Sequence, residues 1–294
     1  MSRRGWFLFL FTGLLWGVPY LFIKVAVDPD NGVTPAAVVC IRTAIGALIL
    51  IPWAIHEKSL RAALRGLKYV IPYAILEMIG PWILIGTAEQ KISSGLAGLL
   101  VASVPIFATI FASMKGDKTV WHHKRLFGLV IGFIGLVLVV GVESIKGGAD
   151  PLGIAMMLLA SLGYSYAVMF VQSGLPGVSG VAINGVAMVI TAIFYLPFTV
   201  AQWPSHHISA GAIWSLIGLG VLSTGIAFAV FFTLVDEIGA ARASLVTYLN
   251  TAFAVVLGAI ILQEDFTIGV MIGLPLVLIG SYFASRKSEV AANV

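Results

Sequence analysis

Charged side chains are scarce in this sequence, and their scarcity limits the kinds of protein it can form. Of its 294 residues, only 10% are Asp, Glu, Lys or Arg, whereas 60% are hydrophobic and the mean hydropathy is +1.04. Soluble domains carry about 25% charged residues, so this chain could not cover its whole surface with groups that water solvates. A large soluble catalytic domain is therefore excluded, and an all-α polytopic membrane protein is predicted.

Cysteine is nearly absent as well. The one thiol, Cys40, lies inside an apolar run, which excludes an intrachain disulfide and a cysteine-rich metal site. His122 and His123 are adjacent in a basic segment and lack further ligands at metal spacing. No glycine-rich phosphate loop is present, so nothing in the sequence supports the use of ATP. We expect no metal and no cofactor.

One short pattern, Gly177-Val178-Ser179-Gly180, is shared with intramembrane serine proteases. The next histidines, His206 and His207, fall in a loop that we expect on the opposite side of the membrane. A serine and a histidine separated by the bilayer cannot form a catalytic pair. The protein is therefore expected not to be an enzyme.

Apolar segments of membrane-spanning length fill the chain. About 20 apolar residues cross a bilayer. The first segment, from Gly5 to Val27, exceeds the ~7–15 residues of a signal-peptide core and has no Ala-x-Ala site, so we interpret it as a retained span. Ten spans are expected, at residues 5–27, 33–55, 69–88, 94–113, 126–142, 152–172, 182–202, 211–233, 241–262 and 268–285.

Basic residues indicate how these spans are oriented, because Lys and Arg concentrate in cytoplasmic loops. With the N-terminus in the cytoplasm, only Lys91 and Lys146 fall outside, and most acidic residues fall in outer loops. Both termini are therefore expected in the cytoplasm, and the net charge of +4 indicates topology rather than nucleic-acid binding. The cytoplasmic set is Arg3, Arg4, Lys58, Arg61, Arg65, Lys68, Lys115, Lys118, Lys124, Arg125, Arg286 and Lys287.

The two halves of the chain resemble each other after a shift of 146 residues. Trp16-Gly17-x-x-Tyr20 then falls on Leu162-Gly163-x-x-Tyr166. Each half holds five expected spans, and this odd number makes the second half enter the membrane from the opposite side. Residues 5–142 and 152–285 are thus predicted to be inverted repeats, followed by a cytoplasmic tail at 286–294. Inverted repeats predict alternating access about a site near the membrane midplane.

Four motifs follow one another along the chain: Leu14-Leu15-Trp16-Gly17 with Lys24, Ser94-Gly95-Leu96-Ala97 leading to Pro105-Ile106-Phe107, Gly239-Ala240-Ala241-Arg242-Ala243-Ser244 through Phe253, and Glu264-x-x-Thr267. Together they resemble the drug/metabolite transporter superfamily, EamA type, over most of the chain. Within it, the sequence is most similar to the YddG exporters of aromatic amino acids. This resemblance implies two five-helix EamA repeats and export of amino acids, particularly aromatic ones. In the second half Leu162 replaces the tryptophan and Phe170 replaces Lys24, so any polar site is asymmetric.

Two charged residues are expected deep within spans, where each costs at least ~2.5–3.5 kcal/mol on insertion scales. Arg42 and Glu77 fall at a similar depth in the second and third spans. They form a structural ion pair, or they contact the carboxylate and the ammonium of a substrate, or Glu77 carries a proton. Lys24 either snorkels to the interface or completes a cavity-lining stripe with Trp16 and Tyr20, since the three are spaced four apart.

Aromatic residues supply the expected wall of a cavity. Trp16 and Trp82 lie near mid-span, where an interfacial belt does not explain them. They pack within the bundle or form walls for flat, apolar or cationic substrates. Asn250 is a mid-span polar group that needs a partner, either another helix or a substrate. The cavity candidates are Trp16, Tyr20, Glu77, Trp82, Tyr164, Tyr166, Phe228, Tyr248 and Asn250.

Prolines within spans mark bends, because each removes a backbone donor. A bend or gate is expected at Gly80-Pro81, beside Glu77, with Pro19 and Pro105 as further candidates. Gly128-x-x-x-Gly132 and Gly269-x-x-x-Gly273 favour close helix packing, either within a monomer or between monomers of a homodimer. A monomer is expected.

The sequence therefore predicts a transporter of small molecules in the plasma membrane, of the bacterial inner-membrane type, with the lipid bilayer as its partner. Its alternatives are uptake instead of export, the movement of other drugs or metabolites, and a non-transporting scaffold or receptor. Proton exchange, facilitated diffusion and movement driven by membrane potential are all compatible with these residues.

Overall fold

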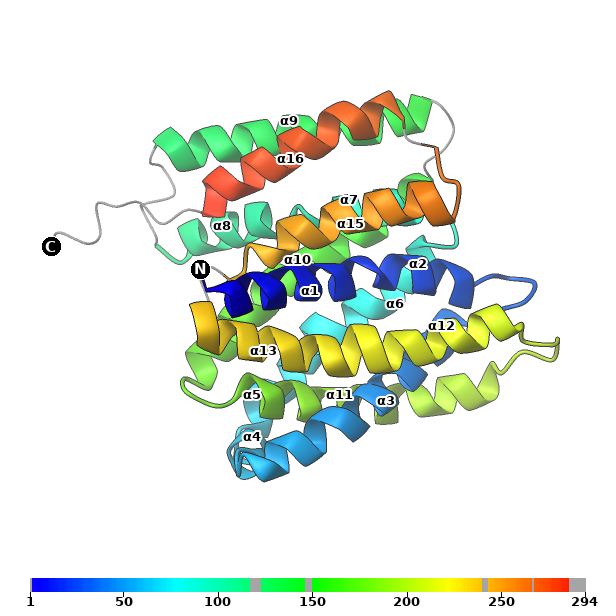
Figure 1. Cartoon of the computed structure of the whole chain (residues 1–294), viewed down its shortest axis with the longest axis vertical. Coiled ribbons are helices and arrows are strands. Elements are labelled where there is room, and N and C mark those ends of the chain that lie inside the picture. Colours follow the sequence, from blue (N-terminus) through cyan, green and yellow to red (C-terminus); the bar gives the residue numbers. More distant parts are fainter. Residues whose placement is uncertain (1, 117–122, 146–149, 240–242, 266, 286–294) are drawn as a thin grey trace, which may run out of the picture.

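The structure is a computed structural model that describes residues 2–116, 123–145, 150–239, 243–265 and 267–285. Every regular element in these ranges is a helix, and the long helices lie side by side in one bundle (Figure 1). The elements are α1 (Arg3–Gly17), α2 (Pro19–Ala26), α3 (Pro35–His56), α4 (Leu60–Arg65), α5 (Leu67–Ala74), η1 (Ile75–Ile79), α6 (Gly80–Ala88), α7 (Ser94–Val101), α8 (Val104–Met114), α9 (His123–Ile145), α10 (Pro151–Gly174), α11 (Gly180–Ala201), α12 (Ala210–Gly220), η3 (Val221–Ile226), α13 (Ala227–Ile238), α15 (Val246–Ile261) and α16 (Ile268–Ser285).

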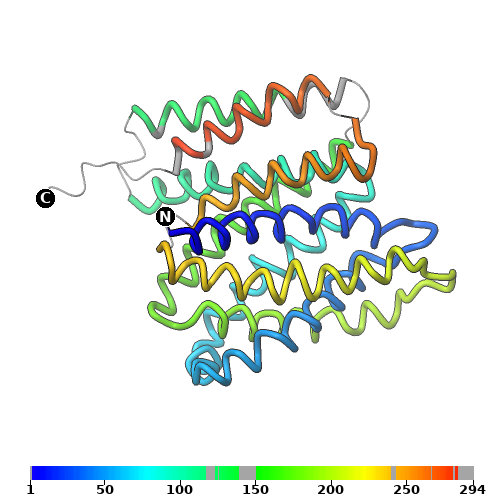
Figure 2. Tube along the Cα trace, viewed as in Figure 1, coloured from blue at the N-terminus to red at the C-terminus, as the bar shows by residue number. Residues whose placement is uncertain are grey.

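Many of these helices have the length and composition needed to cross a membrane. Seven stretches qualify, and three further apolar helices within the described ranges are shorter, at Leu126–Leu138, Val246–Ile261 and Ile268–Gly280. Their order along the chain can be followed in the Cα trace of Figure 2. The predicted all-α membrane architecture is thereby supported. The seven long stretches are Arg3–Ala26, Pro35–His56, Leu67–Ala88, Ser94–Met114, Pro151–Gly174, Gly180–Ala201 and Ala210–Ile238.

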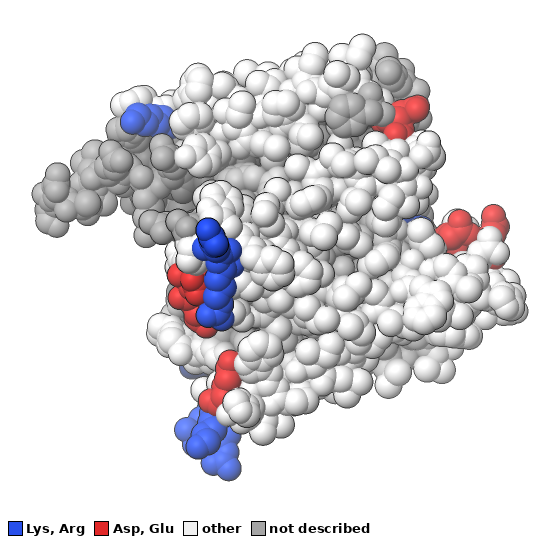
Figure 3. Space-filling view, viewed as in Figure 1, with Lys and Arg blue, Asp and Glu red and all other residues white. Residues whose placement is uncertain are grey.

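On the face drawn in Figure 3, the charged side chains at the surface lie at the two ends of the bundle, with an uncharged band between them. We call the end that carries the N-terminus the basic end; its residues include Arg3, Arg4, Lys58, Arg61 and Arg65. The opposite end, here the acidic end, includes Asp28, Asp30, Asp150, Glu264 and Asp265. Several residues of the sequence argument lie outside the described part of the chain, namely Lys118, His122, Lys146, Arg242 and the tail at 286–294.

Prolines interrupt the spans, and in one place the interruption includes a π-helix. Pro81 has no N–H to donate to the carbonyl of Glu77, one turn earlier. The residue before it, Gly80, donates instead to the carbonyl of Ile75, five residues back, which is the π-helical bond of η1. The second π-helix, η3, begins at Val221, 146 residues after η1 begins. π-Helical turns are rare and occur frequently at functional sites.

Close helix packing explains the glycines of the last spans. α9 and α16 lie side by side at one edge of the bundle (Figure 1). A Cβ built on Gly280 would collide with the backbone of Gly132, so the two helices approach at glycine surfaces. Gly135 likewise lies against the backbone of Gly273. The glycines therefore serve packing within one chain, one of the two alternatives that the sequence left open.

Candidate functional site

A large cavity of about 850 Å³ occupies the interior of the bundle. It extends from Tyr20, Ile23 and Ile85 to Val178 and Val235 at the basic end. Towards the acidic end it is closed by a cluster of buried apolar side chains. This cluster includes Ile23, Val27, Val33, Ala88, Ile92 and Leu96. The cavity thus reaches the basic end and is sealed from the acidic end.

Arg42 provides the positive charge of this cavity. It lies on α3 and is only 6% exposed. Its Nε and Nη2 atoms donate to the hydroxyl oxygen of Thr224 on η3, at 3.2 and 3.1 Å. The guanidinium lies over the indole ring of Trp82, 3.8 Å from the ring centroid. A cation–π contact and a pair of hydrogen bonds therefore hold the guanidinium in place.

Glu77 provides the negative charge, and it lies within η1. Its Oε2 atom is buried and has no hydrogen-bond partner. Both Arg42 and Glu77 are in the described part of the chain, yet the structure forms no ion pair between them. The structural pairing considered from the sequence is therefore not formed. Contact with substrate and proton carriage stay as predictions.

Most of the predicted aromatic wall lies around the cavity. Trp16 packs against Phe228 and Phe231, with ring centroids 5.6 and 4.6 Å apart. Tyr166 lies elsewhere, against Phe111, with ring centroids 5.6 Å apart. It is the one predicted wall residue that the structure places outside the lining. The predicted residues found in the lining are Trp16, Tyr20, Glu77, Trp82, Tyr164, Phe228, Tyr248 and Asn250.

Lys24 does not line the cavity, which corrects the interpretation of it as the end of a cavity-lining stripe. Its Nζ atom donates to the carbonyl oxygens of Glu89, at 2.5 Å, and of Ile92, at 2.8 Å. Glu89 is the C-cap of α6, and Ile92 lies in the connection between α6 and α7. The ammonium therefore satisfies two backbone carbonyls that follow α6 at the acidic end, and of the predicted stripe only Trp16 and Tyr20 line the cavity.

Two of the predicted bend residues line the cavity, and the other two begin the helix that follows the π-helix η1. Pro19 and Pro105 line the cavity. Gly80 and Pro81 do not line it, but they begin α6 directly after η1. A Cβ built on Gly163 would lie 3.0 Å from the ring of Pro81, so α10 packs closely against this broken span.

Comparison with known proteins shows which protein family this chain matches. The sequence matches the EamA-like transporter family twice, over residues 3–141 and 151–286. The chain belongs to the EamA-like transporter family. A solved crystal structure superposes on this transporter with a TM-score of 0.68, covering 97% of each chain at 16% sequence identity, a likeness of fold alone.

Three relatives of this transporter are described as uncharacterized transporters. One from Bacillus subtilis (strain 168), YoaV, is 28% identical and covers 93% of this chain and 96% of its own. One from Archaeoglobus fulgidus is 25% identical over 97% and 99% of the two chains. The Escherichia coli (strain K12) inner membrane transporter YedA is 25% identical over 95% and 92%. None of these descriptions names a substrate, so the similarity to YddG exporters gains no support from them.

Sequence reasoning missed several polar residues of the transporter's cavity. The phenol of Tyr73, on α5, donates to Oδ1 of Asn184, on α11, at 3.0 Å, and both residues line the cavity. Ser223 lines the cavity with a buried hydroxyl that has no partner. The 146-residue shift places Ser223 on Glu77 and could have identified it. Nothing in the sequence could have identified Thr224 as the partner of Arg42.

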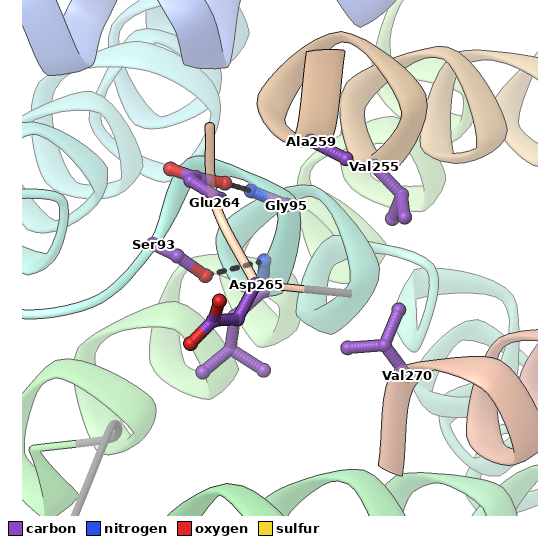
Figure 4. A pocket seen from close by; sticks show the side chains of 8 residues that line it. Ser93, Gly95, Val255, Ala259, Glu264, Asp265 and Val270 are labelled. Atoms are coloured by element: carbon purple, nitrogen blue, oxygen red, sulfur yellow. Dashed lines mark hydrogen bonds between the residues drawn. The ribbon is translucent and has the colours of Figure 1, made fainter. Parts of the chain in front are cut away.

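A second, much smaller cavity lies at the acidic end of the transporter. Its volume of about 10 Å³ is enough for a single water molecule at most. Ser93, Gly95, Glu264 and Val270 are among its lining residues (Figure 4). Among the residues that the structure describes, no group of three His, Cys, Asp or Glu is placed to hold a metal ion.

Proposed function

We propose that this transporter exports aromatic amino acids and related amphipathic compounds through its central cavity. The observation that carries the proposal is that one cavity holds a cation and an acid that are not paired with each other, Arg42 and Glu77. An amino acid at neutral pH is a zwitterion, so it offers a partner to each. The ring of an aromatic amino acid would stack on the aromatic wall.

The chemistry of the two charged groups supports this pairing. Thr224 takes N–H groups from only one edge of the Arg42 guanidinium, which has five donors in all, so donors remain for a substrate carboxylate. The unpartnered carboxylate oxygen of Glu77 is an acceptor for an ammonium group. Trp82 fixes the plane of the guanidinium, which limits the orientations in which a carboxylate can bind.

We further propose that the long and short helices form ten spans, arranged as two inverted repeats of five. Equivalent helices of the two halves contact each other, α3 with α11 and α9 with α16. The π-helices η1 and η3 also begin at equivalent positions. With the basic end and both termini in the cytoplasm of a bacterial inner membrane, this structure is the inward-facing state of an alternating-access cycle. Substrate enters from the basic end and leaves when the acidic end opens.

Flux through purified protein in liposomes tests the proposal. Labelled phenylalanine or tryptophan should cross in a saturable manner, and unlabelled substrate should compete. Phenethylamine, which lacks the carboxylate, and phenylpropionate, which lacks the ammonium, should compete less well than phenylalanine. Flux of other metabolites alone would assign a different substrate class, and net uptake by oriented vesicles would reverse the direction. No flux across a wide panel would favour a scaffold or receptor.

A pH jump across the same vesicles tests the energy source. Proton exchange predicts that an imposed proton gradient drives phenylalanine against its own gradient. Facilitated diffusion predicts equilibration only, and a membrane-potential mechanism predicts a response to valinomycin-induced potassium diffusion potentials instead.

A further inference from the structure

The acidic end contains a buried carboxyl group that the proposed transport mechanism does not use. Glu89 directly follows α6 and is 0% exposed, and neither of its carboxyl oxygens has a hydrogen-bond partner among the described residues. An ionised carboxylate in this place would lose its hydration and gain no hydrogen bond in return. The neutral acid is the form that such a site accommodates.

The charged and titratable groups around Glu89 come from three elements. Lys24 and Tyr20 lie on α2, Arg42 lies on α3, and Glu264 lies between α15 and α16. Lys24 directs its ammonium to two backbone carbonyl oxygens, and Arg42 directs its guanidinium to Thr224. Neither cation donates a hydrogen bond to the Glu89 carboxyl group.

Two other carboxylates at the acidic end have the partners that Glu89 lacks. Glu264 accepts from the N–H groups of Ser94 and Gly95, at 2.7 and 2.9 Å (Figure 4). Asp150 accepts from the N–H groups at the start of α10, and these backbone bonds hold the pKa of Asp150 below its usual range. Glu89 therefore differs from Glu264 and Asp150 because its carboxyl group is buried and receives no hydrogen bond.

We propose that Glu89 is a proton-binding site of the closed acidic end, loaded and unloaded from the solution that this end faces. The inference rests on the alternating access proposed above. When the end opens, water reaches the carboxyl group, its O–H bond breaks, and the proton passes to water while the electron pair stays on the oxygen. The carbonyls that hold Lys24 separate from it in the same step, which leaves the ammonium free to face the new carboxylate.

Opening of the acidic end should depend on pH, because its closed and open states bind different numbers of protons. The closed end binds one proton that the open end does not, so acid favours the closed end and alkali favours the open end. An exposed glutamate loses its proton at about pH 4.3, so the open form is ionised at neutral pH. The open-to-closed ratio should therefore rise up to about tenfold per pH unit.

The proton regulates this end and is not carried across the membrane. Glu89 is absent from the lining of the large cavity, which is the part of the interior that reaches the basic end. The 146-residue shift places Val235 where Glu89 stands and Phe170 where Lys24 stands. The acid and the lysine are therefore not repeated at these two positions of the basic end, and only the solution at the acidic end should set the proton occupancy of Glu89.

Cysteine accessibility measures the opening directly. Val33 is buried at the acidic end, where its side chain is only 4% exposed. The variant Val33→Cys, made in a Cys40→Ser background, therefore places a single thiol that a reagent reaches only when this end opens. A membrane-impermeant maleimide is added outside liposomes at constant internal pH, over an external range of about pH 6 to 8. The rate is divided by that of Asp30→Cys, an exposed site, to remove the ionisation of the thiol itself. The normalised rate should rise with external pH, up to about tenfold per unit.

Two matched variants separate the role of Glu89 from that of its neighbour Glu264. Glu89→Gln should flatten the profile, whereas Glu264→Gln should keep the slope because Glu264 already has its donors. A flat profile in the parent, an unchanged slope in Glu89→Gln, or a dependence on internal pH would overturn the proposal. A preserved slope without phenylalanine flux would overturn only the substrate assignment. Absence of labelling at every pH would overturn the opening on which both proposals rest.

A second measurement needs no substitution at Glu89. Dicyclohexylcarbodiimide reacts with neutral carboxyl groups in apolar surroundings, so peptide mass spectrometry of the unsubstituted protein should find Glu89 modified and Glu264 unmodified. The modification should slow as external pH rises. Equal modification of both residues, or of neither, would contradict the assignment.

Discussion

Glu77 and Ser223 occupy equivalent positions 146 residues apart, each the third residue of a π-helical segment. Each also has a buried side-chain oxygen without a hydrogen-bond partner, and each lines the large cavity. An unsatisfied buried polar group costs about 1–3 kcal/mol, so a protein retains one where another state supplies the partner or where function needs it. The shared position is what the proposed pair of repeats would produce.

Removing the hydroxyl of Ser223 should stabilise this state. Ser223→Ala deletes an unpartnered buried group, so we expect a gain of about 1 kcal/mol, or roughly 2 °C in the midpoint of thermal unfolding. The control is Ser161→Ala, because the Ser161 hydroxyl donates to the carbonyls of Leu100 and Met157, at 3.3 and 3.0 Å. Unfolding in detergent, followed by intrinsic fluorescence, compares the two. A loss of stability in Ser223→Ala would contradict the unpartnered geometry.

Replacing Arg42 by lysine should weaken the binding of the substrate carboxylate. Lysine keeps the charge, but it lacks the planar fork that contacts Thr224 and the face that stacks on Trp82. Losing one charge-assisted bond of about 1.5–3 kcal/mol corresponds to roughly ten- to hundredfold in Kd for phenylalanine. Equilibrium binding of labelled phenylalanine to purified protein measures the change.

Substrate analogues provide the control for Arg42→Lys. Phenethylamine lacks the carboxylate, so its Kd should stay nearly constant in Arg42→Lys. Glu77→Gln should behave in the opposite way, losing affinity for phenethylamine while phenylpropionate is spared. Equal losses for all three compounds in both variants would point to a general collapse of the cavity instead of separate contacts.

Part of this site could be predicted from the sequence, because residue spacing and proline positions determine it locally. The spacing of Trp16 and Tyr20 places them on one helix face, and Pro81 predicts a break beside Glu77. The partners of Lys24 could not be predicted, since backbone carbonyls are the same at every residue. The partner of Arg42 lies 182 residues away, so only the packing of α3 against η3 reveals it.

Enlarging Gly280 should separate the pair of helices at the edge of the bundle. Gly280→Val places a branched side chain against the backbone of Gly132, where even a Cβ collides, and overpacking of this kind costs about 1–3 kcal/mol. Thermal unfolding should shift downward by several degrees. The control is Gly211→Ala, whose Cβ would meet its nearest neighbour at 3.7 Å. An unchanged transition in Gly280→Val would show that α9 and α16 do not need this contact.

The proposed inverted repeat also predicts a contact that is not formed among the residues the structure describes. Lys24 now closes the acidic end against the turn of Glu89 and Ile92. The 146-residue shift carries these positions to Phe170, Val235 and Ile238. In the present state Phe170 packs against Tyr69, with ring centroids 5.9 Å apart, while Val235 lines the cavity. If the halves exchange conformations, Phe170 should close the basic end against the turn at 235–238.

Paired cysteines in a Cys40→Ser background test this exchange. Lys24→Cys with Ile92→Cys reports closure of the acidic end, and Phe170→Cys with Ile238→Cys reports closure of the basic end. A short bifunctional thiol reagent should crosslink both pairs, each in a different state, so phenylalanine should change the two yields in opposite directions. Either crosslink should stop flux in liposomes, because alternating access needs both closures in turn. Crosslinks that leave flux intact, or yields that rise and fall together, would show that the two ends do not alternate.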